Sequence, residues 1–123
     1  MKIFLDTSVL SDTSFAGLAD TLAEQSLAGD TFLVSALTHF QILWGYSTAK
    51  LSSLRYETFL EKFGVEVAPL VEEDATLAAR KRPSRTNTID ALIAATVSRY
   101  QAIIWTKDSD FLNFLPRNLV KMV

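Results

Sequence analysis

The sequence predicts an α/β fold, a three-layer α/β/α sandwich with a central parallel sheet of four to five strands. Short apolar runs alternate with helical patterns along the chain, which is typical of a parallel sheet covered on both faces. The 123 residues contain no internal repeat, low-complexity tract or linker, so we expect one domain spanning residues 1–123. Ligands of such sheets bind outside the carboxyl ends of the strands.

The N-terminal half of the chain alternates strand and helix patterns. The apolar run KIFL is ended by DTS, which indicates a buried strand leading into a turn. Apolar residues then recur at helical spacing, with Gly29 and later Gly45 as expected helix ends. The expected elements are a strand at 2–5, a helix at 14–29, a strand at 31–34 and helices at 35–45 and 49–63.

The C-terminal half continues the alternation. Pro83 stops one helical pattern, and the alanine-rich stretch NTIDALIAATVSRY is the clearest helix of the chain. The expected elements are a strand at 64–70, helices at 72–82 and 87–100, a strand at 102–105, a helical turn at 108–115 and a strand at 118–123.

The composition is that of an ordinary globular protein, with 49% hydrophobic and 21% charged residues. The absence of cysteine excludes disulfides, thiolate metal sites and a cysteine nucleophile. The N-terminal apolar run meets Asp6 too early for a signal peptide, and no window approaches the roughly 18 apolar residues of a membrane span. We therefore expect a cytoplasmic protein without a membrane segment.

Carboxylates follow two of the predicted strands. Asp6 comes directly after the first strand, and Asp108 and Asp110 come after the strand at 102–105. If these strands are neighbours, the three acids share one edge of the sheet, and the helix beginning near Asn87 adds Asp90. Converging carboxylates repel one another unless a cation lies between them. Oxygen-only ligands favour Mg²⁺ or Mn²⁺ over zinc.

Each acid also has a structural explanation. Asp108 suits the N-cap of the turn that follows it, Asp90 falls near a capping-box position after Asn87, and Asp6 suits an Asx-turn. Taken singly, these structural roles are favoured. The metal-binding interpretation depends on the acids meeting in space.

Three segments resemble the signature segments of PIN-domain ribonucleases, most closely the small VapC-type toxins of toxin–antitoxin pairs. They are FLDTSVL at 4–10, IDALIAAT at 89–96 and IIWTKDSDF at 103–111. The resemblance covers nearly the whole chain and implies a PIN-like fold and a nuclease that uses Mg²⁺ or Mn²⁺ to hydrolyse RNA. It also implies metal ligands Asp6, Asp90 and Asp108, an auxiliary acid Asp110, and supporting hydroxyls Thr7, Ser8 and Thr106.

One segment departs from the family pattern. The family places a glutamate in T-x-x-E-L, whereas the segment THFQIL at 38–43 has Gln41 at that position. Three interpretations remain open: an enzyme that works with three aspartates and Asp110, a weakened or inactive nuclease that binds RNA or an antitoxin, and a chain inactivated on purpose. His39, the chain's only histidine, points away from Gln41 on a helix and is expected to lie at the surface.

Other phosphate-handling folds fit less well. A phosphoacceptor receiver domain needs paired acids after the first strand, where this chain has Asp6 alone. A haloacid-dehalogenase-type phosphatase needs D-x-D, and Ser8 occupies the second position.

The partners expected from the resemblance are RNA, a cognate antitoxin and a second copy of the chain. The formal net charge of -2 gives no overall attraction to RNA, but RKRPSR at 80–85 concentrates cations. The alternative interpretation of this segment is a solvated helix end, and the alternative for Lys107 is a solvated side chain. Candidate RNA contacts are Arg80, Lys81, Arg82, Arg85 and Lys107. Candidate residues of an apolar partner groove are Phe40, Leu43, Trp44, Leu54 and Phe59.

Overall fold

A five-stranded parallel sheet forms the middle layer of the protein, which confirms the predicted fold class. The computed structural model describes residues 1–10 and 15–123. The strand order is β3–β2–β1–β4–β5, and all four pairings are parallel. The strands are β1 (Lys2–Leu5), β2 (Thr31–Ser35), β3 (Glu66–Ala68), β4 (Ile103–Thr106) and β5 (Val120–Met122).

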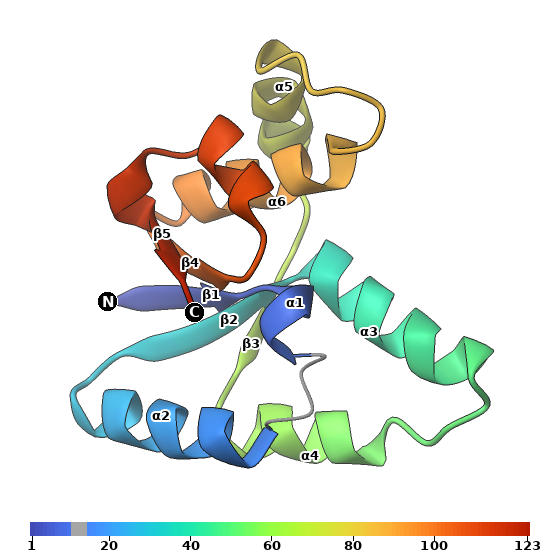
Figure 1. Ribbon diagram of the computed structural model, residues 1–123, viewed down its shortest axis with the longest axis vertical. Helices are drawn as coiled ribbons and strands as arrows, with labels where there is room; N and C mark the ends of the chain where they lie inside the picture. The colour runs from blue at the N-terminus through green and yellow to red at the C-terminus, as the bar shows by residue number, and fades with distance from the viewer. Residues whose placement is uncertain (11–14) are drawn as a thin grey trace.

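Helices cover both faces of this sheet. They are α1 (Thr7–Leu10), α2 (Phe15–Leu27), α3 (Ala36–Thr48), α4 (Leu54–Lys62), α5 (Glu72–Arg80) and α6 (Thr88–Arg99), with 3₁₀ turns η1 (Ser109–Asn113) and η2 (Arg117–Leu119). Figure 1 shows α5 and α6 on one side of the sheet and α2 and α4 on the other. Among the described residues, no helix is long and apolar enough to cross a lipid bilayer.

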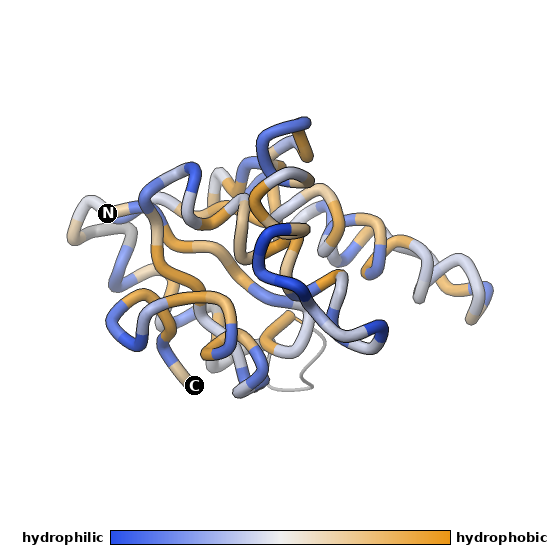
Figure 2. Tube along the Cα trace, turned by 90° about the horizontal axis from the view of Figure 1, so that it is seen from above, coloured by the Kyte–Doolittle hydropathy of each residue, from blue (hydrophilic) through white to orange (hydrophobic). Residues whose placement is uncertain are grey.

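Successive side chains of each strand point to opposite faces of the sheet, and this divides the core into two layers. Phe4, Leu33 and Ile104 face α6 and η1, whereas their neighbours Leu5, Val34 and Trp105 face the side of α2 and α4. Both sets of side chains are buried, so each strand is apolar on both faces, as a central parallel sheet requires. Hydrophobic colour accordingly runs along strands that cross the middle of the trace in Figure 2.

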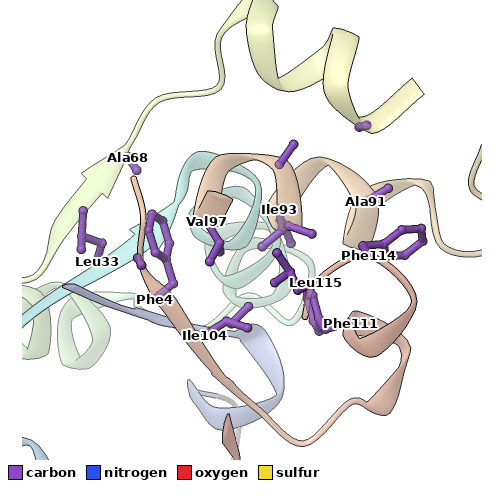
Figure 3. Close-up of a cluster of buried hydrophobic side chains, with 14 residues drawn as sticks. Phe4, Leu33, Ala68, Ala91, Ile93, Val97, Ile104, Phe111, Phe114 and Leu115 are labelled. Carbon is purple, nitrogen blue, oxygen red and sulfur yellow. The ribbon is translucent and has the colours of Figure 1, made fainter. Parts of the chain in front are cut away.

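The core on the α6 side fixes the two elements that carry acids. Ile93 and Val97 of α6 and Phe111 of η1 are almost fully buried. In Figure 3, Val97 points towards the sheet near Phe4 and Ile104, and Phe111 lies beside Leu115 under the first half of α6. Because Asp90 and Asp110 are sequence neighbours of buried Ala91 and Phe111, this packing determines where their carboxylates lie.

Several element boundaries differ from the predicted ones. Gly45 does not end its helix, because α3 continues to Thr48. No atom lies within 4 Å of where a Cβ at Gly45 would be, so packing does not require a glycine at this position, and its only effect is a lower helix propensity. The helix predicted at 49–63 begins later, at Leu54, since Lys50 has a positive φ of 56°. Helix α1 was predicted only as a turn. The predicted helix start at Ser14 lies outside the described residues.

Candidate metal centre

The topology brings the ends of β1 and β4 together. From β1 the chain crosses to β2 on one side and later to β4 on the other, and this reversal is where parallel sheets form ligand crevices. Leu5 pairs in register with Trp105, and the backbone N–H of Asp6 donates to the carbonyl of Trp105 at 3.1 Å. Asp6 therefore leaves β1 beside Thr106, two residues before Asp108.

Two hydroxyls hold the carboxylate of Asp6. Ser8 Oγ and Thr106 Oγ1 each donate to Asp6 Oδ2 at 2.7 Å. Thr106 is fully buried and Asp6 is 6% exposed, so this oxygen is satisfied by protein donors rather than by bulk water. These hydroxyl contacts, rather than the Asx-turn suggested by the sequence, account for the position of the Asp6 carboxylate.

The same hydroxyls also fix the backbone after β4. Thr106 Oγ1 accepts the N–H of Asp108 at 3.0 Å, and Ser8 Oγ accepts the N–H of Lys107 at 2.9 Å. Each hydroxyl therefore accepts a hydrogen bond from a backbone N–H that follows β4 and donates one to the Asp6 carboxylate that follows β1. This pair of hydrogen-bonded bridges determines the position of Asp108 relative to Asp6.

Three further carboxylates converge beside these strand ends. Asp90, Asp108 and Asp110 each offer a carboxylate oxygen, and these oxygens lie within 4.8 Å of one another. Asp108 also caps η1, because its Oδ1 accepts the N–H of Asp110 at 2.9 Å. Its structural and metal-binding interpretations are therefore compatible. The capping box suggested for Asp90 does not form around Asn87, which makes no side-chain cap hydrogen bond.

Burial and the clustering of these carboxylates raise the pKa of Asp90. Its pKa rises from 3.8 to about 6, first through burial and then through the negative charges of Asp108, Asp6 and Asp110. A raised carboxyl pKa means that the charged form is unfavourable in the folded protein. A divalent cation removes this cost, and carboxylate oxygens are the donors that Mg²⁺ and Mn²⁺ prefer. The residues present therefore fit such an ion.

A family model of the PIN domain matches residues 3–114. The chain belongs to the PIN-domain family. PIN domains are nuclease domains that use divalent metal ions, which agrees with the chemistry of the acidic cluster.

Solved structures share the fold of this PIN domain. They include VapBC2 from Rickettsia felis bound to a DNA fragment from their promoter, with 16% identity, a TM-score of 0.73 and coverage of 100% of this chain and 99% of that one. VapBC-1 from nontypeable Haemophilus influenzae has 16% identity, a TM-score of 0.70 and coverage of 100% and 97%. FitAcB from Neisseria gonorrhoeae has 21% identity, a TM-score of 0.67 and coverage of 98% and 95%. Comparison with curated protein sequences gives no match.

Gln41 is joined to the residue that follows Asp6 by a hydrogen bond. Thr7 Oγ1 donates to Gln41 Oε1 at 2.7 Å, which joins α1 to α3 one residue after Asp6. This contact could not be read from the sequence, since the two residues are 34 positions apart and α1 was not predicted. His39 is half-buried and its Nδ1 is 2.8 Å from the hydroxyl of buried Tyr56, so it faces α4 instead.

The candidate RNA contacts are at the surface. Arg80, Lys81, Arg82 and Arg85 are exposed, and none forms an ion pair with a carboxylate of the described residues. They occupy the end of α5 and the connection to α6, whose first turn carries Asp90. Lys107 is exposed and directly precedes Asp108.

Only some residues of the expected partner groove are exposed to solvent. Phe40, Trp44 and Leu54 are 63%, 60% and 67% exposed. Leu43 is half-buried against the core, and Phe59 is buried within it. Phe59 points from α4 into the core and does not contribute to an open surface. We call the exposed set of Phe40, Trp44 and Leu54 the α3–α4 patch.

A buried ion pair between α5 and α6 was not predicted from the sequence. Asp74 is 1% exposed, and its carboxylate accepts from Arg99 Nε at 2.8 Å and from Thr96 Oγ1 at 2.9 Å. Asp74 ends the acidic run EED, which in sequence suggests a solvated helix start. Only the packing of α5 against α6 distinguishes it from exposed Glu72 and Glu73.

Proposed function

We propose that this PIN domain is a metal-dependent endoribonuclease, acting in the cytoplasm as the toxin of a toxin–antitoxin pair. The observation that carries the proposal is the convergence of Asp90, Asp108 and Asp110 within 4.8 Å, beside the hydroxyl-bound carboxylate of Asp6. A bound cation relieves the mutual repulsion of acids gathered in this way. The donor chemistry is that of Mg²⁺ or Mn²⁺.

Each site residue has a defined task in this proposal. Asp90, Asp108 and Asp110 hold the ion, and Asp6 adds negative charge and a further carboxylate oxygen. When bound, the ion supplies Lewis-acid stabilisation of the phosphodiester and a lowered pKa for water at the site. Ser8 and Thr106 keep Asp6 and Asp108 in register through the hydrogen bonds described above. In-line hydrolysis would leave a 5′-phosphate and a 3′-hydroxyl.

The basic segment 80–85 gives the acidic site a way to hold RNA. A phosphodiester approaching clustered carboxylates is repelled, and nearby cations offset that repulsion. The exposed side chains of Arg80, Lys81, Arg82 and Arg85 precede the helix that carries Asp90, and Lys107 precedes Asp108. We assign these five residues to the RNA backbone.

The α3–α4 patch is proposed as the surface that an antitoxin covers. Exposed aromatic and aliphatic side chains at helical spacing, such as Phe40 and Trp44, suit the apolar face of a partner helix. Solved structures with this fold include a toxin-antitoxin complex from Klebsiella pneumoniae, with 18% identity, a TM-score of 0.65 and coverage of 96% of this chain and 94% of that one. Homodimerisation is proposed alongside antitoxin binding.

A second candidate function rests on Gln41. A neutral amide at this position removes one negative charge from the site compared with the family glutamate, which weakens cation binding. The chain would then be a PIN domain that binds RNA or an antitoxin without cutting. The two functions differ in one observable, the appearance of RNA fragments.

Incubation of the purified protein with structured RNA and Mn²⁺ tests the proposal. We expect cleavage by the native chain and by Asp20→Asn, whose carboxylate is exposed on α2, but not by Asp6→Asn. Absence of fragments with all three folded proteins would reject the nuclease and support the binding module. Equal cleavage by Asp6→Asn would indicate a contaminating nuclease and would also reject the proposed site.

A further inference from the structure

We infer that Gln41 limits the free protein to one divalent cation, held by Asp90, Asp108 and Asp110. The inference rests on the proposed metal-dependent function, but it concerns the number of ions rather than the reaction. It follows from an asymmetry of the site. Three carboxylates form one close group that does not include Asp6, whereas the side chain joined to the residue after Asp6 is the neutral amide of Gln41.

The side of Asp90 has the ligands for one ion. Three carboxylate oxygens lie within 4.8 Å of one another, and small shifts of side chains that are exposed or half-buried bring them to the spacing of cation ligands. Asp108 is already oriented by its bonds to Asp110 and Thr106, so little conformational entropy remains to be lost there. Asp6 is not a member of this close group.

Gln41 and Asp6 do not offer a comparable set of cation ligands. Gln41 is neutral, and its Oε1 already accepts a hydrogen bond from Thr7 at 2.7 Å. Asp6 Oδ2 accepts two hydroxyls at 2.7 Å. A cation bound by Asp6 and Gln41 would therefore depend on Asp6 Oδ1 and on Gln41 Oε1. The Gln41 oxygen would have to bind the cation while accepting the hydrogen bond from Thr7.

Electrostatics is unfavourable for a second ion bound by Asp6 and Gln41. Two divalent ions about 4 Å apart repel strongly, and shared or flanking carboxylates must offset the repulsion. With Gln41 in place of an acid, the flanking carboxylate is missing. Substrate phosphate oxygens would have to supply the negative charge, so a second ion should bind only together with RNA.

Counting bound Mn²⁺ in the absence of RNA tests the inference. The protein is stripped with a chelator, dialysed, and titrated with Mn²⁺ alone, with calorimetry for the affinity and electron paramagnetic resonance for the count. We expect about one ion for the native chain and about two for Gln41→Glu, in which the hydrogen bond from Thr7 is retained. Gln101→Glu adds the same charge at an exposed position before β4, at the opposite end of the sheet, and should remain at about one.

The outcomes separate this inference from the proposed function. Two ions on the native chain, no ion at all, or an unchanged count in Gln41→Glu would overturn it, even if RNA is cleaved. A count of one that rises to two in Gln41→Glu would support it, even if the native chain cuts no RNA. Circular dichroism of each variant confirms that a changed count does not come from a changed fold.

Discussion

Thr106 is the residue whose single hydroxyl links both strand ends of the site. It donates to Asp6 and accepts from the backbone of Asp108, and it is fully buried. Replacement by the isosteric valine leaves a buried carboxylate oxygen and a backbone N–H without this partner. A buried polar group that loses its partner costs about 1–3 kcal/mol.

We therefore expect Thr106→Val to lower the free energy of unfolding by about 1–3 kcal/mol and to weaken Mn²⁺ binding. Urea denaturation and calorimetry measure the two effects. Thr96→Val is the matched control, since Thr96 is a buried threonine that donates to the carboxylate of Asp74 away from the site. It should lose stability but keep its affinity for Mn²⁺. Native Mn²⁺ affinity in Thr106→Val would contradict the positioning role.

Asp90 makes the stability of the metal-free protein depend on pH. Its pKa in the folded protein is raised to about 6, above the ordinary 3.8, so the folded state binds the proton more tightly than the unfolded state. The stabilisation is complete below pH 3.8 and is lost as the pH rises through 6.

In chelator, we expect the melting temperature to fall between about pH 4 and pH 6, and Mg²⁺ to reverse part of the fall at the upper end of this interval. Asp90→Asn removes the titrating group and should flatten the curve over the same interval. Differential scanning calorimetry of both proteins measures the slopes. An equally steep fall in Asp90→Asn would show that another group is responsible.

At the residue scale, the sequence predicts where the acids lie but not the contacts between them. Because parallel strands end at one edge of a sheet, the positions of Asp6 and Asp108 after two strands are enough to place them together. The Thr7–Gln41 hydrogen bond and the burial of Asp74 depend on how helices pack, and neither spacing nor composition encodes that. Phe59 was misplaced for the same reason, since an apolar residue on a helix has the same pattern whether it faces a core or a partner.

At the element scale, α5 and α6 are joined by the buried pair of Asp74 and Arg99. Burial by itself raises the pKa of Asp74, but hydrogen bonds from Arg99, the Val71 backbone and Thr96 outweigh it and hold that pKa below its ordinary value. Arg99 also donates to the carbonyl of Pro69 at 2.8 Å, which ties the chain before α5 to the end of α6. This connection helps to hold the helix that carries Asp90.

Removing the cation of this pair should destabilise the two helices. Loss of one partner from a buried ion pair costs about 3–5 kcal/mol, and because the Arg99 side chain is 26% exposed we expect Arg99→Met to fall at the lower end of that range. Arg80→Met, at an exposed position at the end of α5, should change stability by less than about 0.5 kcal/mol. Urea denaturation compares them, and equal values would reject a stabilising pair.

Element boundaries were less predictable than element types. The alanine-rich helix and all five strands are predicted, because helical periodicity and short apolar runs are clear signals in this sequence. Helix α1 has four residues, too few for a periodic signal. Glycine is disfavoured inside helices, so the sequence predicts a helix end at Gly45, yet α3 continues past it at an exposed position.

At the scale of the whole molecule, a net charge of -2 means that RNA affinity must come from local charge. The basic segment 80–85 is the densest group of cations, and it adjoins the helix that carries Asp90. Each cation that neutralises a phosphate of single-stranded RNA contributes about 0.7 to the slope of log affinity against log salt.

We expect the double variant Arg82→Ser/Arg85→Ser to reduce that slope by about 1.4, measured by fluorescence anisotropy with labelled single-stranded RNA in chelator to prevent cleavage. Lys50→Ser/Lys62→Ser is the control, since these cations belong to the connection after α3 and to α4, which lies on the opposite side of the sheet (Figure 1). An unchanged slope in the first variant, or an equal change in both, would remove the basic segment from the RNA-binding surface.

The proposed nuclease site requires a cation among the acids at the carboxyl ends of β1 and β4. Anomalous diffraction from crystals soaked in Mn²⁺ locates such an ion directly. We expect a peak within ligand distance of carboxylate oxygens from Asp90, Asp108 and Asp110. Absence of a peak there, or a peak only elsewhere on the molecule, would contradict it.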